Sequence, residues 1–168
     1  QAVWLRQDGT PVVNILYKTT GDVFGGYPLT LTGNYLNFSA PTVTIDGQIC
    51  TVTTSSTTAI TCTVAPRLTL PSHNSFTVSV GNSLAVINQA FSYVLRWSDI
   101  RTWGTDMPPI DGDLVYVPKG MNLLVDQSTP NLKGILVENG TLTFADESDM
   151  VISAGFIAVD GGIFVAGT

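Results

Sequence analysis

Apolar and polar residues alternate in short runs along most of the chain, and Gly, Pro, Asn or Asp residues separate the runs. The runs are rich in Val, Ile, Thr and aromatic residues, which favour extended backbone and pack well on a pleated sheet. Helix signals are nearly absent, because apolar residues do not recur at the spacing of an amphipathic helix. The pattern predicts an all-β protein of short strands and tight turns.

The runs form two groups that meet near residues 93–97. In residues 10–95 they are spaced as in a β-sandwich. In residues 96–168, ILVENGTLTFA from Ile135 aligns with IAVDGGIFVAG from Ile157, which sets the offset of the repeat at 157 − 135 = 22. Such a period without helices is typical of successive rungs of a β-helix or a similar solenoid. Two ordinary hairpins with Asn-Gly and Gly-Gly turns fit the same residues.

The first group carries motifs that resemble a known family. PVVNI, GDVFGGYPLTLTGNYL, VTIDGQIC and AITCTVAP follow one another within residues 10–95. In this order they are similar to the IPT/TIG module of plexins, cell-surface receptors and some transcription factors. The resemblance implies an immunoglobulin-like β-sandwich over these residues.

The second group also resembles a family. WSDIRTWGTDMPPIDGDLVYVPKGMNLLVD, which begins near the start of residues 96–168, matches several motifs of the eight-glycine domain in order. That domain occurs in fibrocystin-type proteins, where it follows IPT modules, and in certain extracellular hyaluronan-degrading proteins. The resemblance favours the solenoid over the hairpins and implies an extracellular or cell-surface protein.

Two cysteines, Cys50 and Cys62, lie on either side of the polar segment TTSSTT. A hairpin bend there would bring them within disulfide distance, and two buried free thiols are the alternative. The IPT/TIG resemblance adds that extracellular members have a disulfide at this place. Two Asn-x-Ser/Thr sequons predict N-linked glycans at Asn37 and Asn139 if the host is eukaryotic. Paired cysteines and sequons together favour a secreted glycoprotein.

Composition excludes two classes of partner. The net charge is −6, with 7 Lys and Arg residues scattered singly, so the chain cannot neutralise a run of phosphates and nucleic acid is not expected to bind. The most apolar stretch, MVISAGFIAVDGGIFVAG, is interrupted by an aspartate and glycines, so no membrane insertion is expected. Because 44% of the residues are hydrophobic and only 12% are charged, we expect surface to be buried against partners.

No combination of residues indicates catalysis, a metal site or a cofactor. The single histidine, His73, has only an adjacent serine, which is the wrong geometry for a triad. Asp111 and Asp113 flank a glycine, and they are interpreted as solvated turn residues, as are the acids of ADESDM. Those acids are Asp146, Glu147 and Asp149. Trp97 and Trp103 are interpreted as core residues rather than as sugar-stacking platforms.

Residues 1–9, QAVWLRQDG, form a strand-like run with no neighbour in sequence to pair with. The eight-glycine resemblance implies at least one further strand after GGIFVAGT, and the run at the start has the character of that strand. We predict that residues 1–9 complete the second domain of a neighbouring copy by strand addition. The residues of this assembly strand are Ala2, Val3, Trp4 and Leu5, with Val3 and Leu5 in the core. A disordered tail, or a segment cut from a tandem array, are the alternatives.

These observations predict a structural subunit of an extracellular fibre or a large ectodomain. Its partners would be copies of itself, joined head to tail in a filament, and covalent glycans. Two other functions remain open from the sequence. One is a glycan-processing enzyme fragment, by analogy with the hyaluronan-degrading relatives, and the other is a ligand-binding receptor segment.

Overall fold

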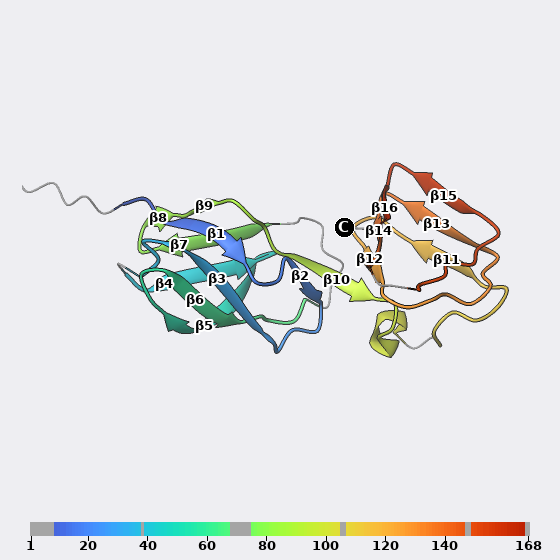
Figure 1. The fold of residues 1–168 in the computed structure, drawn as a ribbon, viewed down its shortest axis with the longest axis horizontal. Helices are drawn as coiled ribbons and strands as arrows, with labels where there is room; N and C mark the ends of the chain where they lie inside the picture. Colours follow the sequence, from blue (N-terminus) through green and yellow to red (C-terminus); the bar gives the residue numbers. More distant parts are fainter. Residues whose placement is uncertain (1–8, 38, 68–74, 105–106, 147–148, 167–168) are drawn as a thin grey trace, which may run out of the picture. The chain divides into compact units, whose positions relative to one another are not determined.

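The computed structural model describes residues 9–37, 39–67, 75–104, 107–146 and 149–166 (Figure 1). These residues form β-strands, short connections and one turn of 3₁₀-helix, so the predicted all-β class is confirmed. They divide into two compact units. The first holds the described residues up to 67 together with 75–92, and the second holds those from 93 onward. The sequence predicts the boundary between residues 95 and 96.

The first unit has immunoglobulin-like sheets. Its strands are β1 (Val12–Leu16), β2 (Thr20–Asp22), β3 (Pro28–Asn34), β4 (Pro41–Ile45), β5 (Gln48–Ser55), β6 (Ala59–Thr63), β7 (Phe76–Val80), β8 (Ser83–Leu84) and β9 (Val86–Ile87). Neighbours follow the order β8-β7-β4-β5-β6-β3-β1-β9. Pairing along this order is antiparallel except between β1 and β9, which are parallel.

Strand β5 changes its pairing partner along its length. Its residues 48–50 pair with β4, whereas residues 51–55 pair with β6. The period-2 alternation of the sequence sends one side of each strand into the core. Leu31 in β3, Val43 in β4 and Ile60 in β6 are all completely buried.

The second unit is built from strands that pair with one another only in parallel. They are β10 (Ser92–Arg96), β11 (Leu114–Val117), β12 (Asn122–Val125), β13 (Gly134–Glu138), β14 (Thr141–Phe144), β15 (Ile157–Asp160) and β16 (Ile163–Ala166), and η1 (Ile100–Trp103) follows β10. Strands β10, β12, β14 and β16 lie side by side in one sheet, and β11, β13 and β15 form another (Figure 1). Parallel pairing requires the chain to travel around the unit between neighbouring strands.

The register of these strands matches the repeat found in the sequence. Ile135 of β13 lies opposite Ile157 of β15, which is the pairing that the sequence repeat predicts. An ordinary hairpin would pair β13 with β14. Instead, β13 pairs with β11 and β15, while β14 pairs with β12 and β16. The hairpin alternative is therefore wrong for these strands.

In each turn of the chain, a tight corner connects the two sheets, and the corners of successive turns lie next to one another. Gly120, Asn139 and Gly161 occupy equivalent corner positions, and all have positive φ, of 78°, 53° and 62°. The backbone ladder continues through the corners, because Gly120 N donates to Asn139 O and Asn139 N donates to Asp160 O at 3.4 and 2.9 Å. The next residue, Gly140, has no room for a side chain, since a Cβ there would lie 2.6 Å from the Pro118 carbonyl oxygen.

A single apolar cluster fills the space between these sheets. Its members are Trp97, Val115, Val117, Met121, Leu123, Val125, Leu132, Ile135, Val137, Leu142 and Phe144. Apolar side chains of successive turns lie above one another, as the parallel registers require. Each turn of the chain therefore helps to bury the apolar side chains of the turn before it.

Candidate interaction surface and modification sites

The last strand of the β11-β13-β15 sheet exposes side chains that its neighbour buries. Ile135 and Val137 of β13 are both completely buried. Their register partners in β15, Ile157 and Val159, are 39% and 44% exposed. The same backbone position therefore faces the core in one strand and water in the next.

Strand β16 shows the same contrast. Leu142 of β14 is completely buried, whereas its register partner Phe164 is 43% exposed. The Phe164 ring lies edge-on to Phe144, with ring centroids 5.3 Å apart. Phe164 thus contacts a core residue and yet remains partly exposed.

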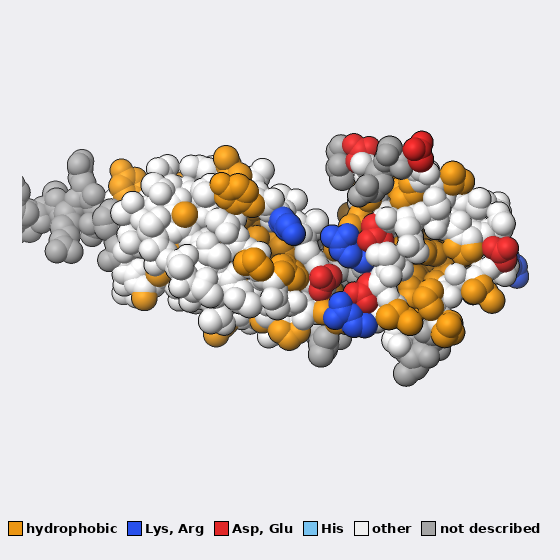
Figure 2. Space-filling model, turned by 60° about the horizontal axis from the view of Figure 1, so that its bottom comes forward, with side chains coloured by type: hydrophobic (Ala, Val, Ile, Leu, Met, Phe, Trp, Pro, Cys, Tyr) orange, Lys and Arg blue, Asp and Glu red, His pale blue; other side chains and the backbone are white. Residues whose placement is uncertain are grey.

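We call this region the β15–β16 surface. It comprises the partly exposed apolar side chains of Ile157, Val159 and Phe164, whose register partners in β13 and β14 are buried. Hydrophobic side chains are visible on the outside of the second unit in Figure 2. Clusters of exposed apolar side chains can mark surfaces at which a protein associates.

A carboxylate at the end of β12 ties the start of the second unit together. Asp126 accepts hydrogen bonds from the backbone N and the hydroxyl of Ser98, at 2.9 and 2.8 Å, and pairs with the Arg96 guanidinium at 3.1 Å. Burial acts to raise the pKa of the Asp126 carboxyl, but the hydrogen bonds from Ser98 and the Arg96 charge outweigh it and hold the pKa below its usual range. This network fixes the chain where it leaves β10.

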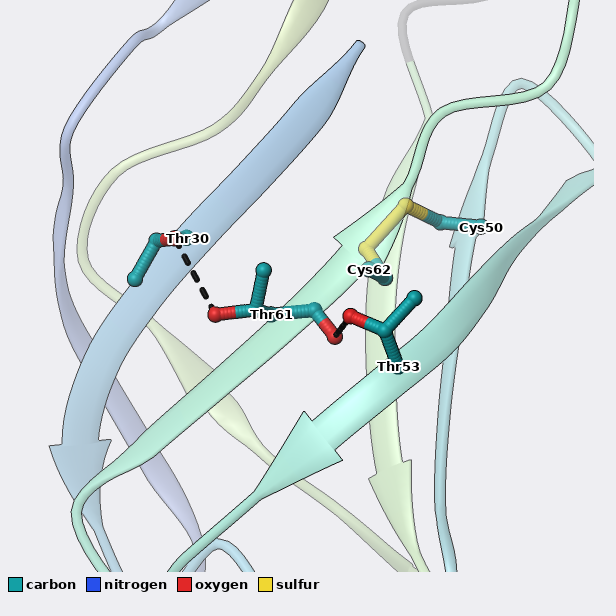
Figure 3. The surroundings of a disulfide bond; sticks show 5 residues. All are labelled: Thr30, Cys50, Thr53, Thr61 and Cys62. Carbon is teal, nitrogen blue, oxygen red and sulfur yellow. Dashed lines mark hydrogen bonds between the residues drawn. A yellow bond between two sulfur atoms is a disulfide. The ribbon is translucent and has the colours of Figure 1, made fainter. Parts of the chain in front are cut away.

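The predicted disulfide is present and joins neighbouring strands. Cys50 of β5 and Cys62 of β6 are bonded, with their Cα atoms 5.4 Å apart (Figure 3). Both residues are buried, at 1% and 0% exposure, so the alternative of two free thiols is wrong. The bond lies where β5 leaves its pairing with β4 and begins to pair with β6.

Both sequon asparagines are exposed. Asn37 lies in the connection after β3, and Asn139 lies at the corner between β13 and β14. The middle residue of the first sequon, Phe38, is outside the described residues. Exposure is what a glycan requires, and glycosylation at both positions stays a prediction.

Two of the carboxylates considered as candidate catalytic groups, Asp111 and Asp113, form hydrogen bonds with the backbone. Asp111 accepts a hydrogen bond from Asn131 N at 2.8 Å, and Asp113 accepts one from Ile110 N at 2.9 Å. These bonds hold the turn before β11, the first of them against the equivalent segment of the next turn of the chain. Asp146 and Asp149 are exposed. Glu147 and His73 lie outside the described residues, and among the residues described no three His, Cys, Asp or Glu side chains could hold a metal ion.

The two tryptophans lie at the start of the second unit. Trp97 is 2% exposed and belongs to the core cluster, against which Trp103 is packed. Their ring centroids are 5.0 Å apart, and Trp103 Nε1 donates to Trp97 O at 3.2 Å. Trp97 is therefore a core residue, as the sequence interpretation proposed, and Trp103 is partly buried at the edge of the core.

The predicted assembly strand, Ala2, Val3, Trp4 and Leu5, lies outside the described residues. Across the part of the chain that the structure describes, no helix is long and apolar enough to cross a membrane.

Comparisons with known proteins agree with the two units. Residues 11–93 match the family model of the IPT/TIG domain, and residues 102–168 match that of the G8 domain. Fibrocystin-L of Homo sapiens is 37% identical over 164 residues, and that of Mus musculus is 35% identical over 167 residues. Both alignments cover 95% of this chain and 4% of the relative.

Other matches cover somewhat less than half of this chain. Fibrocystin of Canis lupus familiaris is 36% identical over 76 residues, which is 45% of this chain and 2% of the relative. Among solved structures, the full extracellular region of plexin A4 matches 47% of this chain and 7% of that chain, at 28% identity and a TM-score of 0.42.

The chain therefore contains an IPT/TIG domain followed by a G8 domain, the eight-glycine family that its sequence resembles. Over nearly its whole length it is homologous to fibrocystin-L. It spans only 4% of the length of those relatives.

Sequence reasoning missed the Asp126 network and the stacked corners. Asp126 ends the motif NLLVD, but its partners Arg96 and Ser98 are far away along the chain, beyond any local pattern. The corners had a signal, because Gly120, Asn139 and Gly161 are residue types that tolerate positive φ.

Proposed function

We propose that this chain is a structural, non-enzymatic segment of an extracellular ectodomain, in which an immunoglobulin-like domain precedes a β-solenoid. The parallel registers around the second unit support the solenoid, because equivalent side chains stack from one turn of the chain to the next. The buried disulfide supports folding in an oxidising compartment. Homology to fibrocystin-L supports a role as one segment of a much longer protein.

The single observation that supports assembly is the β15–β16 surface. Ile157, Val159 and Phe164 occupy register positions whose counterparts are completely buried. A further strand added beside this surface would help to bury these side chains, as β15 and β16 help to bury their counterparts in β13 and β14. In our proposal residues 2–5 of a second copy supply that strand, with Val3 and Leu5 inward. Because donor and acceptor are different surfaces, such contacts run head to tail and form a filament.

Sedimentation velocity over a range of protein concentrations tests this proposal. We expect the full chain to associate, and we expect V159T/F164S to associate much less, because it removes apolar side chains that face the added strand. Leu114 is the matched control, since it is also an exposed apolar side chain of this unit but lies on the outer side of β11. L114S should associate like the unchanged protein. Deletion of residues 1–9 should abolish association.

Each outcome separates the parts of the proposal. A chain that stays monomeric at high concentration would overturn self-assembly and favour a ligand-binding receptor segment. Association that survives the deletion but not V159T/F164S would keep the surface and reject residues 2–5 as the donor. Equal loss in L114S would reject the β15–β16 surface.

The absence of catalysis needs its own test. Asp111 and Asp113 are committed to backbone hydrogen bonds in the turn before β11, which supports a structural role for both. Purified protein incubated with hyaluronan should leave the size of the polymer unchanged. Cleavage that disappears in D111N would overturn this part of the proposal and favour a glycan-processing enzyme.

A further inference from the structure

The hairpin formed by β5 and β6 carries a dense group of exposed hydroxyl groups. Residues 51–58, TVTTSSTT, contain a single apolar side chain, and the others are exposed. The exposed hydroxyl residues are Thr51, Thr53, Thr54, Ser55, Ser56, Thr57 and Thr58. This group belongs to neither the disulfide nor the β15–β16 surface.

Two of these hydroxyls are already used by the hairpin itself. Thr53 Oγ1 donates to Thr61 O at 3.1 Å (Figure 3). Ser56 Oγ accepts from the backbone N of Thr58 and of Ala59, at 3.3 and 3.0 Å, and so shapes the turn. Within the described residues, the side chains of Thr51, Thr54 and Thr57 form no such bond, which leaves their hydroxyls to solvent.

The orientation of Thr51 and Thr54 follows from the register. Thr51 lies opposite Thr63 of β6, and Thr54 lies opposite Thr61. Cys62, between these two β6 residues, is completely buried. Because successive side chains of a strand point to opposite faces, Thr61 and Thr63 face outward, and Thr51 and Thr54 share that outer face.

The hairpin holds its hydroxyls in a fixed position. The Cys50–Cys62 disulfide joins its two strands. The carbonyl oxygen of Thr57 accepts from Leu36 N at 3.0 Å, and that of Thr58 accepts from Gly33 N at 2.9 Å. Thr57 therefore has an anchored backbone and an exposed side chain.

This hairpin is also an edge without protecting charges. No charged residue occurs between Asp46 and Arg67. The pairing of β5 with β4 stops at Cys50, so the described structure leaves one side of residues 53–55 without a partner strand. Uncharged edge strands of high β-propensity invite edge-to-edge association, which proteins prevent with charges, proline or bulky polar groups. A covalent sugar would serve this purpose here.

We propose that Thr51, Thr54 and Thr57 are acceptors for O-linked monosaccharides. In the modification, the threonine Oγ1 attacks the anomeric carbon of a nucleotide- or lipid-phosphate-activated sugar, held by a glycosyltransferase. The new bond is Oγ1–C1, the bond from C1 to the phosphate oxygen breaks, the phosphate leaves with its electron pair, and the hydroxyl proton passes to a base of the transferase. The proposal rests on passage through the secretory route that the proposed function assumes.

The test therefore imposes secretion, by placing the chain behind a heterologous signal peptide in cultured animal cells. After enzymatic removal of N-linked glycans, intact mass should show added sugar, and the mass increment distinguishes hexose from N-acetylhexosamine. Electron-transfer fragmentation of the peptide that spans 51–58 should locate the sugar on Thr51, Thr54 or Thr57. This measurement on the unchanged protein does not depend on the folding of any variant.

Two matched triple variants complete the test. T51S/T54S/T57S retains an acceptor hydroxyl at each position and should keep the sugar. T51V/T54V/T57V has the same shape without hydroxyls and should lose it. A secreted chain with no O-linked sugar, or sugar found only elsewhere, would overturn the proposal. Because secretion is imposed, that result would leave the ectodomain proposal standing.

Discussion

Removal of the disulfide should weaken the first unit and leave the second unit unchanged. Cys50 and Cys62 are separated by 12 positions, for which the chain-entropy estimate of the lost constraint is about 3 kcal/mol. The C50A/C62A variant also loses two buried sulfur atoms from a site that is almost completely inaccessible to water. We therefore expect the free energy of unfolding of the first unit to fall by about 3 kcal/mol or slightly more.

The assay must separate the two units. Trp97 is buried in the second unit and Trp103 packs against it, so fluorescence of these residues does not report on the first unit. Hydrogen exchange followed by mass spectrometry does, because peptides from β3 and β6 report the core around Leu31 and Ile60. In C50A/C62A these peptides should exchange about 100-fold faster through global unfolding of the first unit, which corresponds to about 3 kcal/mol. Peptides from β13 and β14 should be unaffected.

Reduction provides an independent control. Both sulfurs are buried, so a reductant should reach them only when the first unit opens. The rate of reduction should therefore rise with denaturant together with the exchange of β3 and β6. Unchanged exchange in C50A/C62A, or fast reduction of the native protein without denaturant, would refute the argument that this bond stabilises a closed core.

Three further predictions concern the second unit. G140A should destabilise it by about 1–3 kcal/mol in a urea titration followed by tryptophan fluorescence, because the new Cβ would meet backbone oxygen atoms of residues 117 and 118 that cannot move without breaking the β11-β13 ladder. L142A should cost about 2–5 kcal/mol, whereas F164A at the half-exposed register position should cost much less, and equal costs would contradict an open last strand. D126N should destabilise the unit by about 1 kcal/mol at neutral pH. Because the folded pKa of Asp126 is lowered from 3.8, this contribution is present above that value and is lost as pH falls through the lower folded pKa, so the two proteins should converge in acid.

Most of the fold could be predicted because its signals are local. Alternation over a few residues sends Leu31 and Ile60 inward, and the polar segment between the cysteines is sufficient to predict the hairpin that they cross-link. In the first unit, β4–β5, β5–β6 and β7–β8 are pairs of consecutive strands, whereas β3–β6, β4–β7 and β1–β9 join strands farther apart in sequence, which local patterns do not predict. Resemblance to two families supplied the order of the domains, which alternation alone does not give.

The repeat of the second unit was only partly visible in the sequence, for a geometrical reason. Ile135 pairs with Ile157 and Leu142 pairs with Phe164, and both pairs have the same offset (157 − 135 = 164 − 142 = 22). In the preceding turn of the chain, Val115 pairs with Ile135, where the offset is smaller (135 − 115 = 20). A fixed-period comparison finds the first spacing and misses the second, although both pairs lie in the same parallel ladder.

Whether a residue of the candidate surfaces is exposed depends on which strands lie beside it, and a sequence pattern does not contain that information. Ile157 has the same residue type as Ile135 and sits in the same motif, yet one is exposed and the other is buried. Only the order of the strands distinguishes them. Likewise, Thr53 and Thr54 are the same residue type, and the bulge in β5 between its pairings with Cys62 and Thr61 determines which one bonds to the hairpin.

A scarcity of charge connects the two proposed surfaces. With 12% charged residues, the chain has few charged side chains to hydrate its outer faces, and the proposed sugars and neighbours would cover surface that charges do not protect. In the first unit the outer face of the β5–β6 hairpin carries hydroxyls, so a sugar can be attached there without disturbing the core. In the second unit, β15 and β16 expose apolar side chains. These side chains cannot carry a sugar, and only burial against another surface would remove them from water. The same low charge is therefore a common physical reason for both proposals, a sugar on the first unit and association through the second.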